Sequence, residues 1–352
     1  MHARAIRWAA LAVAVPALVL GAAAPAIACA GLVGENGTIR LTRTSTLAAY
    51  HNGVERYVTS FQFSGQGKEV GSIVPLPAVP TDVERGGDWT LQRLEREVAP
   101  PRREVFAEDL AKSAAPAAAE VLLQKKIDAL DITILRGGGA AVGKWATDHG
   151  FLLSPDAPDV LDFYSRRSPV FMAARFDASR ARALGQNSGD GTPIMVTMPT
   201  REPWVPLRIL GLGLDKNEAV KADVFILTDD EPKLLAGGPG LALSRHEWAS
   251  TSLLADLRSD KGMGWIPDRM WFTYLPLDTT AGRLDYDLAM STHAGATPRL
   301  VDTGVEAEQA RAVVTSAGRA VWPIGAGVLT GALAFGVAAA LNRRRSRMGM
   351  AA

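Results

Sequence analysis

The sequence predicts an α+β fold with mainly antiparallel sheets and a few helices, followed by one C-terminal transmembrane helix. Short segments with the two-residue alternation of strands recur along residues 29–303. A few helical segments interrupt them, but strands and helices do not alternate regularly, which favours antiparallel pairing. The third observation is a charge-free apolar run from Val321 to Leu341, since a run of this length is typical of a membrane span.

Residues 1–28 have the three parts of a secretory signal peptide. Arg4 and Arg7 precede an apolar run from Trp8 to Ala24, and the segment ends with Ala26-Ile27-Ala28. Signal peptidase cleaves after such a small-residue pattern. The alternative is an anchor that is never removed, which the Ala-x-Ala end and two prolines disfavour. We therefore expect export and cleavage before Cys29.

Cys29 is the single cysteine of the chain, so no disulfide can form within it. Cleavage would make Cys29 the first residue of the mature protein, which is the position that is acylated in bacterial lipoproteins. The residue three positions earlier, usually Leu in a lipoprotein signal, is Ala26. Two interpretations stay open, namely lipidation at Cys29 and a plain mature N-terminus.

The first part of the body predicts strands joined by a tight turn, and then a helix. The strands are Thr38–Thr44, Glu55–Phe63 and Val70–Val74, and the second places Tyr57, Thr59, Phe61 and Phe63 on one face. His51-Asn52-Gly53 indicates a hairpin turn because Asn-Gly accepts positive φ. A helix is expected from Asp88, as N-cap, to Glu97.

The Ala-rich segment 105–120 is expected to be a loose helix or a linker. A body of this length is large for one core, and two subdomains would meet in this segment if the body is divided. The elements expected after it are strands Val121–Lys126 and Asp131–Leu135, a turn at Arg136–Gly139, and helices Ala140–His149, capped by Gly150, and Ala157–Arg166.

The last part of the body is expected to be rich in strands. They are Val170–Phe176, Ile194–Met198, Leu207–Leu212, Val220–Thr228, Met270–Leu277 and Leu284–Met290, with one helix from Ser250 or Thr251 to Arg258. A polar juxtamembrane stretch, 304–320, then leads to the membrane segment.

Residues 321–341 would span about 31 Å as a helix, enough to cross the hydrocarbon core. Trp322 lies at one edge, where an amphipathic ring suits the interface. Arg343, Arg344 and Arg345 begin the basic tail 342–352, and such clusters stay in the cytoplasm. The sequence therefore predicts a single-pass protein of the cell membrane, with an extracytoplasmic N-terminal domain and a cytoplasmic C-terminus.

Gly327 and Gly331 form a G-x-x-x-G pattern in the predicted membrane helix. Such small residues let two helices approach closely, which predicts a homodimer through this helix. The alternative is a simple anchor, because an Ala- and Gly-rich composition gives the spacing by chance.

The charge of the body argues against nucleic-acid binding. The chain has 38 basic and 37 acidic residues and a net charge of +1. Six of the basic residues and none of the acidic ones lie in the two ends, so residues 29–320 have a net charge of −5. A mildly acidic domain has no electrostatic reason to bind nucleic acid.

The sequence contains no recognisable catalytic or metal-binding pattern. Its histidines lack zinc-helix spacing and no Gly-x-Ser-x-Gly is present, so no metal or cofactor is expected. His246 and Glu247 are the acid–base pair that a hydrolase would use. The acidic groups Asp229–Glu231 and Asp285/Asp287 lack EF-hand spacing and are expected to be solvated. The body's tryptophans are expected to pack in the core: Trp89, Trp145, Trp204, Trp248, Trp265 and Trp271.

One series of segments resembles a known family. The segments are 144–151 (KWATDHGF), 154–157 (SPDA), 160–164 (VLDFY), 170–173 (VFMA), 192–197 (TPIMVT) and 204–208 (WVPLR). The series resembles the bacterial extracytoplasmic proteins grouped as domain of unknown function 2330. The resemblance implies a signal peptide, a body of this length and often a C-terminal anchor. Members often carry further cysteines near the mature N-terminus, whereas this chain has only Cys29.

The family has no established activity, so the resemblance supplies no catalytic residue. The sequence favours a membrane-anchored extracytoplasmic protein that serves as a binding or structural module of the bacterial cell envelope. Its expected partners are the membrane and an envelope ligand or protein. The alternative function is an uncharacterised envelope hydrolase.

Overall fold

The computed structural model describes residues 31–34, 44–61, 67–98, 111–112, 119–186, 192–292 and 296–305. Several sequence predictions lie outside these residues: the signal peptide, Cys29, the juxtamembrane stretch 306–320, the membrane segment with Trp322, Gly327 and Gly331, and the tail with Arg343, Arg344 and Arg345. Within the described part of the chain, no helix is both long and apolar enough to span a membrane.

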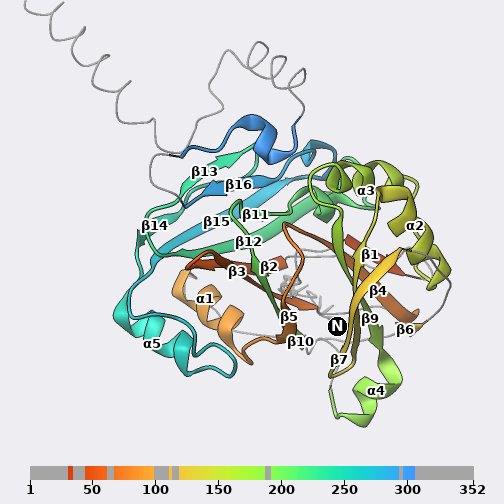
Figure 1. Ribbon diagram of the computed structural model, residues 1–352, viewed down its shortest axis with the longest axis horizontal. Helices are drawn as coiled ribbons and strands as arrows, with labels where there is room; N and C mark the ends of the chain where they lie inside the picture. Colours follow the sequence, from red (N-terminus) through yellow and green to blue (C-terminus); the bar gives the residue numbers. More distant parts are fainter. Residues whose placement is uncertain are drawn as a thin grey trace, which may run out of the picture.

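Three sheets form the body (Figure 1). A seven-stranded sheet has the order β14 (Arg245–Trp248), β15 (Trp271–Thr280), β12 (Ala219–Thr228), β2 (Thr44–His51), β3 (Val54–Phe61), β10 (Thr192–Pro199) and β5 (Asp82–Arg85). A second has the order β1 (Gly31–Gly34), β4 (Gly67–Leu76), β9 (Val170–Asp177), β8 (Leu130–Arg136) and β7 (Glu120–Ile127), with β6 (Ala111–Lys112) beside β4. A small sheet has the order β11 (Trp204–Val205), β16 (Leu288–Ser291) and β13 (Lys233–Ala236).

Among the described strands, all pairs except two are antiparallel. Strands β2 and β12 pair in parallel, as do β4 and β6. Five α-helices accompany the described strands: α1 (Thr90–Val98), α2 (Gly139–Asp148), α3 (Ala157–Ser165), α4 (Ala178–Ala183) and α5 (Thr251–Ser259). The prediction of an α+β fold with mainly antiparallel sheets is therefore confirmed.

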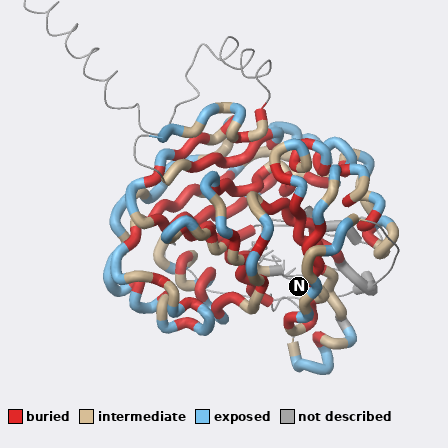
Figure 2. Tube along the Cα trace, in the orientation of Figure 1, coloured by how far each residue is buried: buried red, intermediate tan, exposed pale blue. Residues whose placement is uncertain are grey.

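Alternation along the strands divides the apolar residues into layers. In β12, Val224 and Ile226 join the core shared by the three sheets, whereas Phe225 packs on the opposite face with residues of α1 and α5. In β9, Met172 joins the shared core and Phe171 packs with α2 and α3. Successive side chains of a strand point to opposite faces, so two large sheets sandwich one core and helices cover their outer faces (Figures 1 and 2).

Two turns show why particular residues are required. Asn52 and Gly53 have φ of 51° and 79° and join β2 to β3, which confirms the predicted hairpin. At the start of α2, a Cβ on Gly139 would lie 2.5 Å from the backbone nitrogen of Asp162 in α3. Glycine is thus needed at position 139, where α2 meets α3. The last residue of the predicted turn 136–139 is therefore a helix-packing position.

Three expectations about elements are wrong. Residues Leu207–Leu212 do not form a strand, because Arg208–Gly211 is a 3-10 helix (η1). Of the expected strand 284–290, only residues 288–290 pair with neighbours, as part of β16, which follows a second 3-10 helix, η2 (Ala281–Arg283). Helix α1 begins at Thr90, one residue later than an N-cap at Asp88 would place it. The backbone N–H groups of Asp88 and Trp89, which precede the helix, donate instead to the carboxylate of a distant residue, Asp260.

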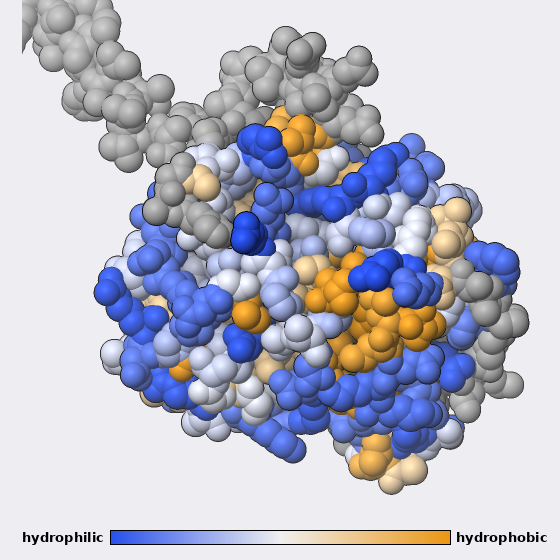
Figure 3. All heavy atoms as spheres, viewed as in Figure 1, coloured by the Kyte–Doolittle hydropathy of each residue, from blue (hydrophilic) through white to orange (hydrophobic). Residues whose placement is uncertain are grey.

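The view in Figure 3 shows a hydrophobic area in the region of β7 and β5 on a largely hydrophilic face. Val121 in β7 and Val79, which precedes β5, are both exposed. Gln124, Lys125 and Lys126 make the following part of β7 polar. Strand β7, at the edge of the six-stranded sheet, is therefore apolar and exposed near its start and polar further along.

Candidate functional site

One buried carboxylate of the described chain, that of Asp287 directly before β16, accepts hydrogen bonds from four different residues. Asp287 is completely buried. Its Oδ1 accepts from the backbone nitrogens of Leu207 and Arg208, at 2.7 and 3.2 Å, and from the Tyr164 hydroxyl at 2.8 Å. Its Oδ2 lies 2.8 Å from Nη1 of Arg167. The two backbone donors, Leu207 and Arg208, lie at the start of the 3-10 helix η1, which replaces the expected strand.

Helix α3 and the residues after it supply two of these donors. Tyr164 and Arg167 are three residues apart and reach Asp287 together. Arg167 also donates to the carbonyl oxygen of Asp302, and its guanidinium lies 4.2 Å from the ring centroid of Trp204. The Tyr164 hydroxyl in turn accepts from the backbone nitrogen of Ile209 at 2.9 Å. These contacts hold the Arg167 guanidinium in one position.

Burial shifts the titration of this network. Burial raises the pKa of Asp287, and Arg167 and the two backbone donors oppose that rise. Burial also raises the pKa of Tyr164, and the neighbouring Asp287 raises it further. The pKa of Arg167 is lowered by burial and partly restored by Asp287. Clustered shifts of this kind are typical of functional sites, although structural ion pairs produce them too.

A cleft of about 1050 Å³ opens beside the network. We call it the Arg167 cleft, and its polar lining residues include Arg167, Thr200, Arg201, Glu202, Arg299 and Asp302. Arg299 pairs with Asp302 at 2.8 Å, and three quarters of its side chain is exposed. Arg201 is exposed and has no ion-pair partner among the described residues. The cleft therefore combines one fixed guanidinium with two exposed ones.

Glu55 is a second unusual carboxyl group, in β3 near this network. It is completely buried, and neither carboxyl oxygen has a hydrogen-bond partner. Burial raises its pKa to about 8, and Arg167 opposes the rise. Sequence analysis missed Glu55, although it precedes Tyr57 and Thr59 on the strand face that we predicted. Extending that alternation by two residues would have placed an acid in the core.

The structure does not join His246 and Glu247 into an acid–base pair. They are neighbours in β14, and adjacent side chains of a strand point to opposite faces. His246 lies 3.2 Å from Glu231 and 3.0 Å from the hydroxyl of Thr273. Glu247 instead pairs with Arg245 at 2.7 Å. The two residues proposed for a hydrolase therefore have different partners.

The other sequence candidates are dispersed. Asp229 pairs with His51 at 2.5 Å, and Asp285 is exposed while Asp287 is buried. The expectation that all these acids are solvated is therefore wrong for Asp287. Among the described residues, no group of three or more His, Cys, Asp or Glu side chains is arranged to hold a metal ion. Trp145 and Trp204 are buried as expected, whereas Trp89 and Trp248 are more than one-third exposed.

Comparisons with solved structures give only distant likenesses. Baculovirus P35 shares 10% sequence identity, and the alignment covers 72% of this chain and 97% of P35 with a TM-score of 0.40. A mutated baculovirus P35 after caspase cleavage also shares 10% identity, with coverage of 70% and 98% and a TM-score of 0.33. Likenesses of this size assign no function to the chain.

Family comparison is more informative. No curated protein matches the chain. One family model, described as an uncharacterized protein conserved in bacteria (DUF2330), matches residues 23–230. That match includes β2 to β12 and the segments in which we noted the resemblance. Since it covers more than half of the sequence, the chain belongs to the DUF2330 family of bacterial proteins.

Proposed function

We propose that this protein is a membrane-anchored, extracytoplasmic binding module of the bacterial cell envelope, and that its Arg167 cleft binds an anionic group. The observation that carries the proposal is the cleft itself, which exposed Arg201 and Arg299 line together with the partly buried, preorganised Arg167. The anchoring part rests on the signal-like residues 1–28 and the apolar run 321–341.

The chemistry of the cleft supports an anion as ligand. A guanidinium can donate two parallel hydrogen bonds to a carboxylate or a phosphate. Arg201 has no competing ion pair among the described residues, so its donors are available. The opposing acids in the lining are Glu202 and Asp302, and Asp302 already accepts from Arg299. These contacts leave Arg201 as the principal anchor, with Arg299 beside it.

A matched set of small ligands tests the proposal on the full chain in lipid nanodiscs. Isothermal titration calorimetry would compare inorganic phosphate, glucuronate and glucose 1-phosphate with uncharged glucose. We expect the anions to compete for one site, and the double change Arg201→Gln/Arg299→Gln to weaken them about tenfold or more, as loss of charge-assisted hydrogen bonds would.

Arg283→Gln is the matched control, because Arg283 is exposed but does not line the cleft. It should leave anion affinity unchanged. Failure of all three anions to bind, or equal affinities for the double variant and the control, would show that the cleft is not an anion site.

A further inference from the structure

A second cavity lies on the outer face of the six-stranded sheet, away from the Arg167 cleft. Its volume is about 370 Å³, near the lower end of the range of roughly 300–1,000 Å³ for small-molecule sites. We call it the sheet groove. Strands β7, β8 and β9 supply its floor and the end of α2 supplies one wall, and its polar lining residues include Gln124, Lys126, Asp131, Thr133, His149 and Arg175.

The wall is a flat ring with a fixed orientation. The imidazole of His149 stacks on the indole of Trp145, with centroids 3.9 Å apart and planes 19° apart. The His149 Nδ1 lies 2.8 Å from the Trp145 carbonyl oxygen, so it donates there and leaves Nε2 as the acceptor of the neutral ring. Trp145 is buried and His149 is half-buried. The helix therefore presents an aromatic platform to the groove.

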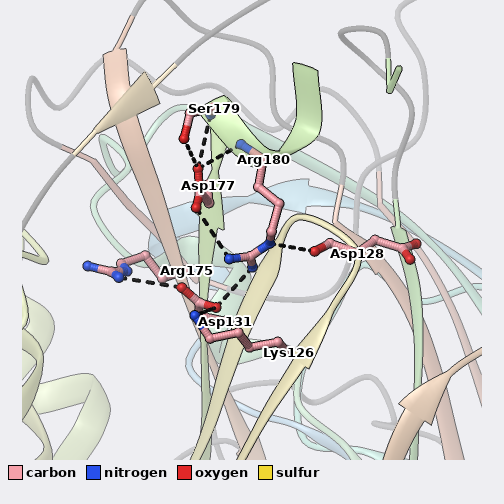
Figure 4. A network of polar contacts seen from close by, with 7 residues as sticks. All are labelled: Lys126, Asp128, Asp131, Arg175, Asp177, Ser179 and Arg180. Carbon is pink, nitrogen blue, oxygen red and sulfur yellow. Dashed lines mark hydrogen bonds and ion pairs between the residues drawn. The ribbon is translucent and has the colours of Figure 1, made fainter. Parts of the chain in front are cut away.

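The floor is fixed by an ion-pair network around Asp131 (Figure 4). The carboxylate of Asp131 lies 2.9 Å from Arg180, 3.3 Å from Lys126 and 3.4 Å from Arg175. Arg180 is itself held by Asp177 at 3.3 Å. Burial tends to raise the pKa of Asp131, but Arg180 and Lys126 lower it below its usual value. Asp131 is thus an ionised acceptor among cationic donors.

We propose that the sheet groove binds a sugar ring. The face of such a ring can stack on His149, as sugars pack on aromatic surfaces. Its hydroxyl groups both donate and accept, which matches a floor where Asp131 accepts, Lys126 and Arg175 donate, and Gln124 and Thr133 do either. A simple anion fits less well, because it would use neither the flat face of His149 nor the acceptor Asp131. This inference does not depend on the proposed anion site.

Saturation-transfer NMR and calorimetry on the full chain would test the proposal. The chain is placed in lipid nanodiscs, since many detergents carry sugar headgroups. The probes are glucose, galactose, mannose and N-acetylglucosamine. At least one should bind. His149→Ala should weaken it about threefold to tenfold, the value of one aromatic stacking contact.

Two further variants make the result decisive. His149→Phe keeps a flat ring and should retain most of the sugar affinity. If His149→Ala loses affinity and His149→Phe keeps it, the lost contact is the stacking surface. Arg201→Gln, in the Arg167 cleft, should leave sugar affinity unchanged. The proposal is wrong if none of the four sugars binds, or if His149→Ala binds them as tightly as the natural protein.

Discussion

Glu55 shows how one residue can set the pH dependence of stability. Its pKa is raised from 4.5 to about 8 in the folded protein. The folded state therefore holds this proton more tightly than the unfolded chain. The contribution of Glu55 to stability is complete below pH 4.5 and is lost as the pH rises toward 8.

Replacing Glu55 by Gln should remove this dependence, because the amide has the same shape and no charge at any pH. We expect equal stabilities near pH 4.5 and a variant that is more stable by a few kcal/mol at pH 8, since one pKa unit corresponds to about 1.4 kcal/mol. Urea unfolding at several pH values measures the difference. If the free energy of unfolding changes with pH in the same way for both proteins, Glu55 does not titrate in this range.

Asp287 shows the opposite case of a buried acid with many partners. Asp287→Asn removes the buried charge that compensates partly buried Arg167, and should destabilise the fold by about 3–5 kcal/mol. Tyr164→Phe deletes a single hydroxyl from the same network and should cost about 1–2 kcal/mol. Exposed Asp285→Asn is the control and should change stability by less than about 0.5 kcal/mol. Equal unfolding midpoints for Asp287→Asn and Asp285→Asn would contradict this description.

At the scale of elements, helix α1 depends on a residue distant in sequence. Asp260 is buried and accepts from the backbone nitrogens of Asp88 and Trp89 and from the hydroxyl of Thr90, at 2.8–3.0 Å. Asp260→Ala should destabilise the protein by about 2–4 kcal/mol, because it removes a charged cap. Hydrogen exchange should then quicken in α1 first.

Asp268→Ala is the control for this change. Asp268 is 96% exposed and pairs with Arg258 at the surface. Such pairs contribute little, so exchange in α1 should stay as in the natural protein. If Asp260→Ala also leaves it unchanged, the distant cap is not what holds the start of the helix.

Elements governed by local sequence could be predicted, and those governed by distant contacts could not. The turn at Asn52-Gly53 and helix α5, whose Ser250 side chain accepts from Leu253, follow from neighbouring residues. Leu207–Leu212 has a strand-like composition, but Asp287 binds its backbone N–H groups from 80 positions away. The pattern of residues within 207–212 gives no sign of the hydrogen bonds to Asp287.

At the scale of the whole molecule, the same limit applies to the sites. The Arg167 cleft joins residues 167, 201 and 299, and the sheet groove joins strands β7 to β9 with the end of α2. None of these residues forms a motif along the chain. The sequence identifies His149 only as the last residue of an expected helix, and its stacking on Trp145 in the structure reveals the platform. Sequence patterns therefore predicted the strands of the sheets better than the Arg167 cleft and the sheet groove.

We propose that the body lies outside the cell while the C-terminal tail lies inside. Single cysteines test it most directly, at Asp268→Cys in the body and Ser346→Cys in the tail, each combined with Cys29→Ser. Asp268 is almost fully exposed, so a membrane-impermeant maleimide should label that variant in intact cells and label the Ser346→Cys variant only after permeabilisation. Labelling of the tail in intact cells, or of the body only after permeabilisation, would contradict the account.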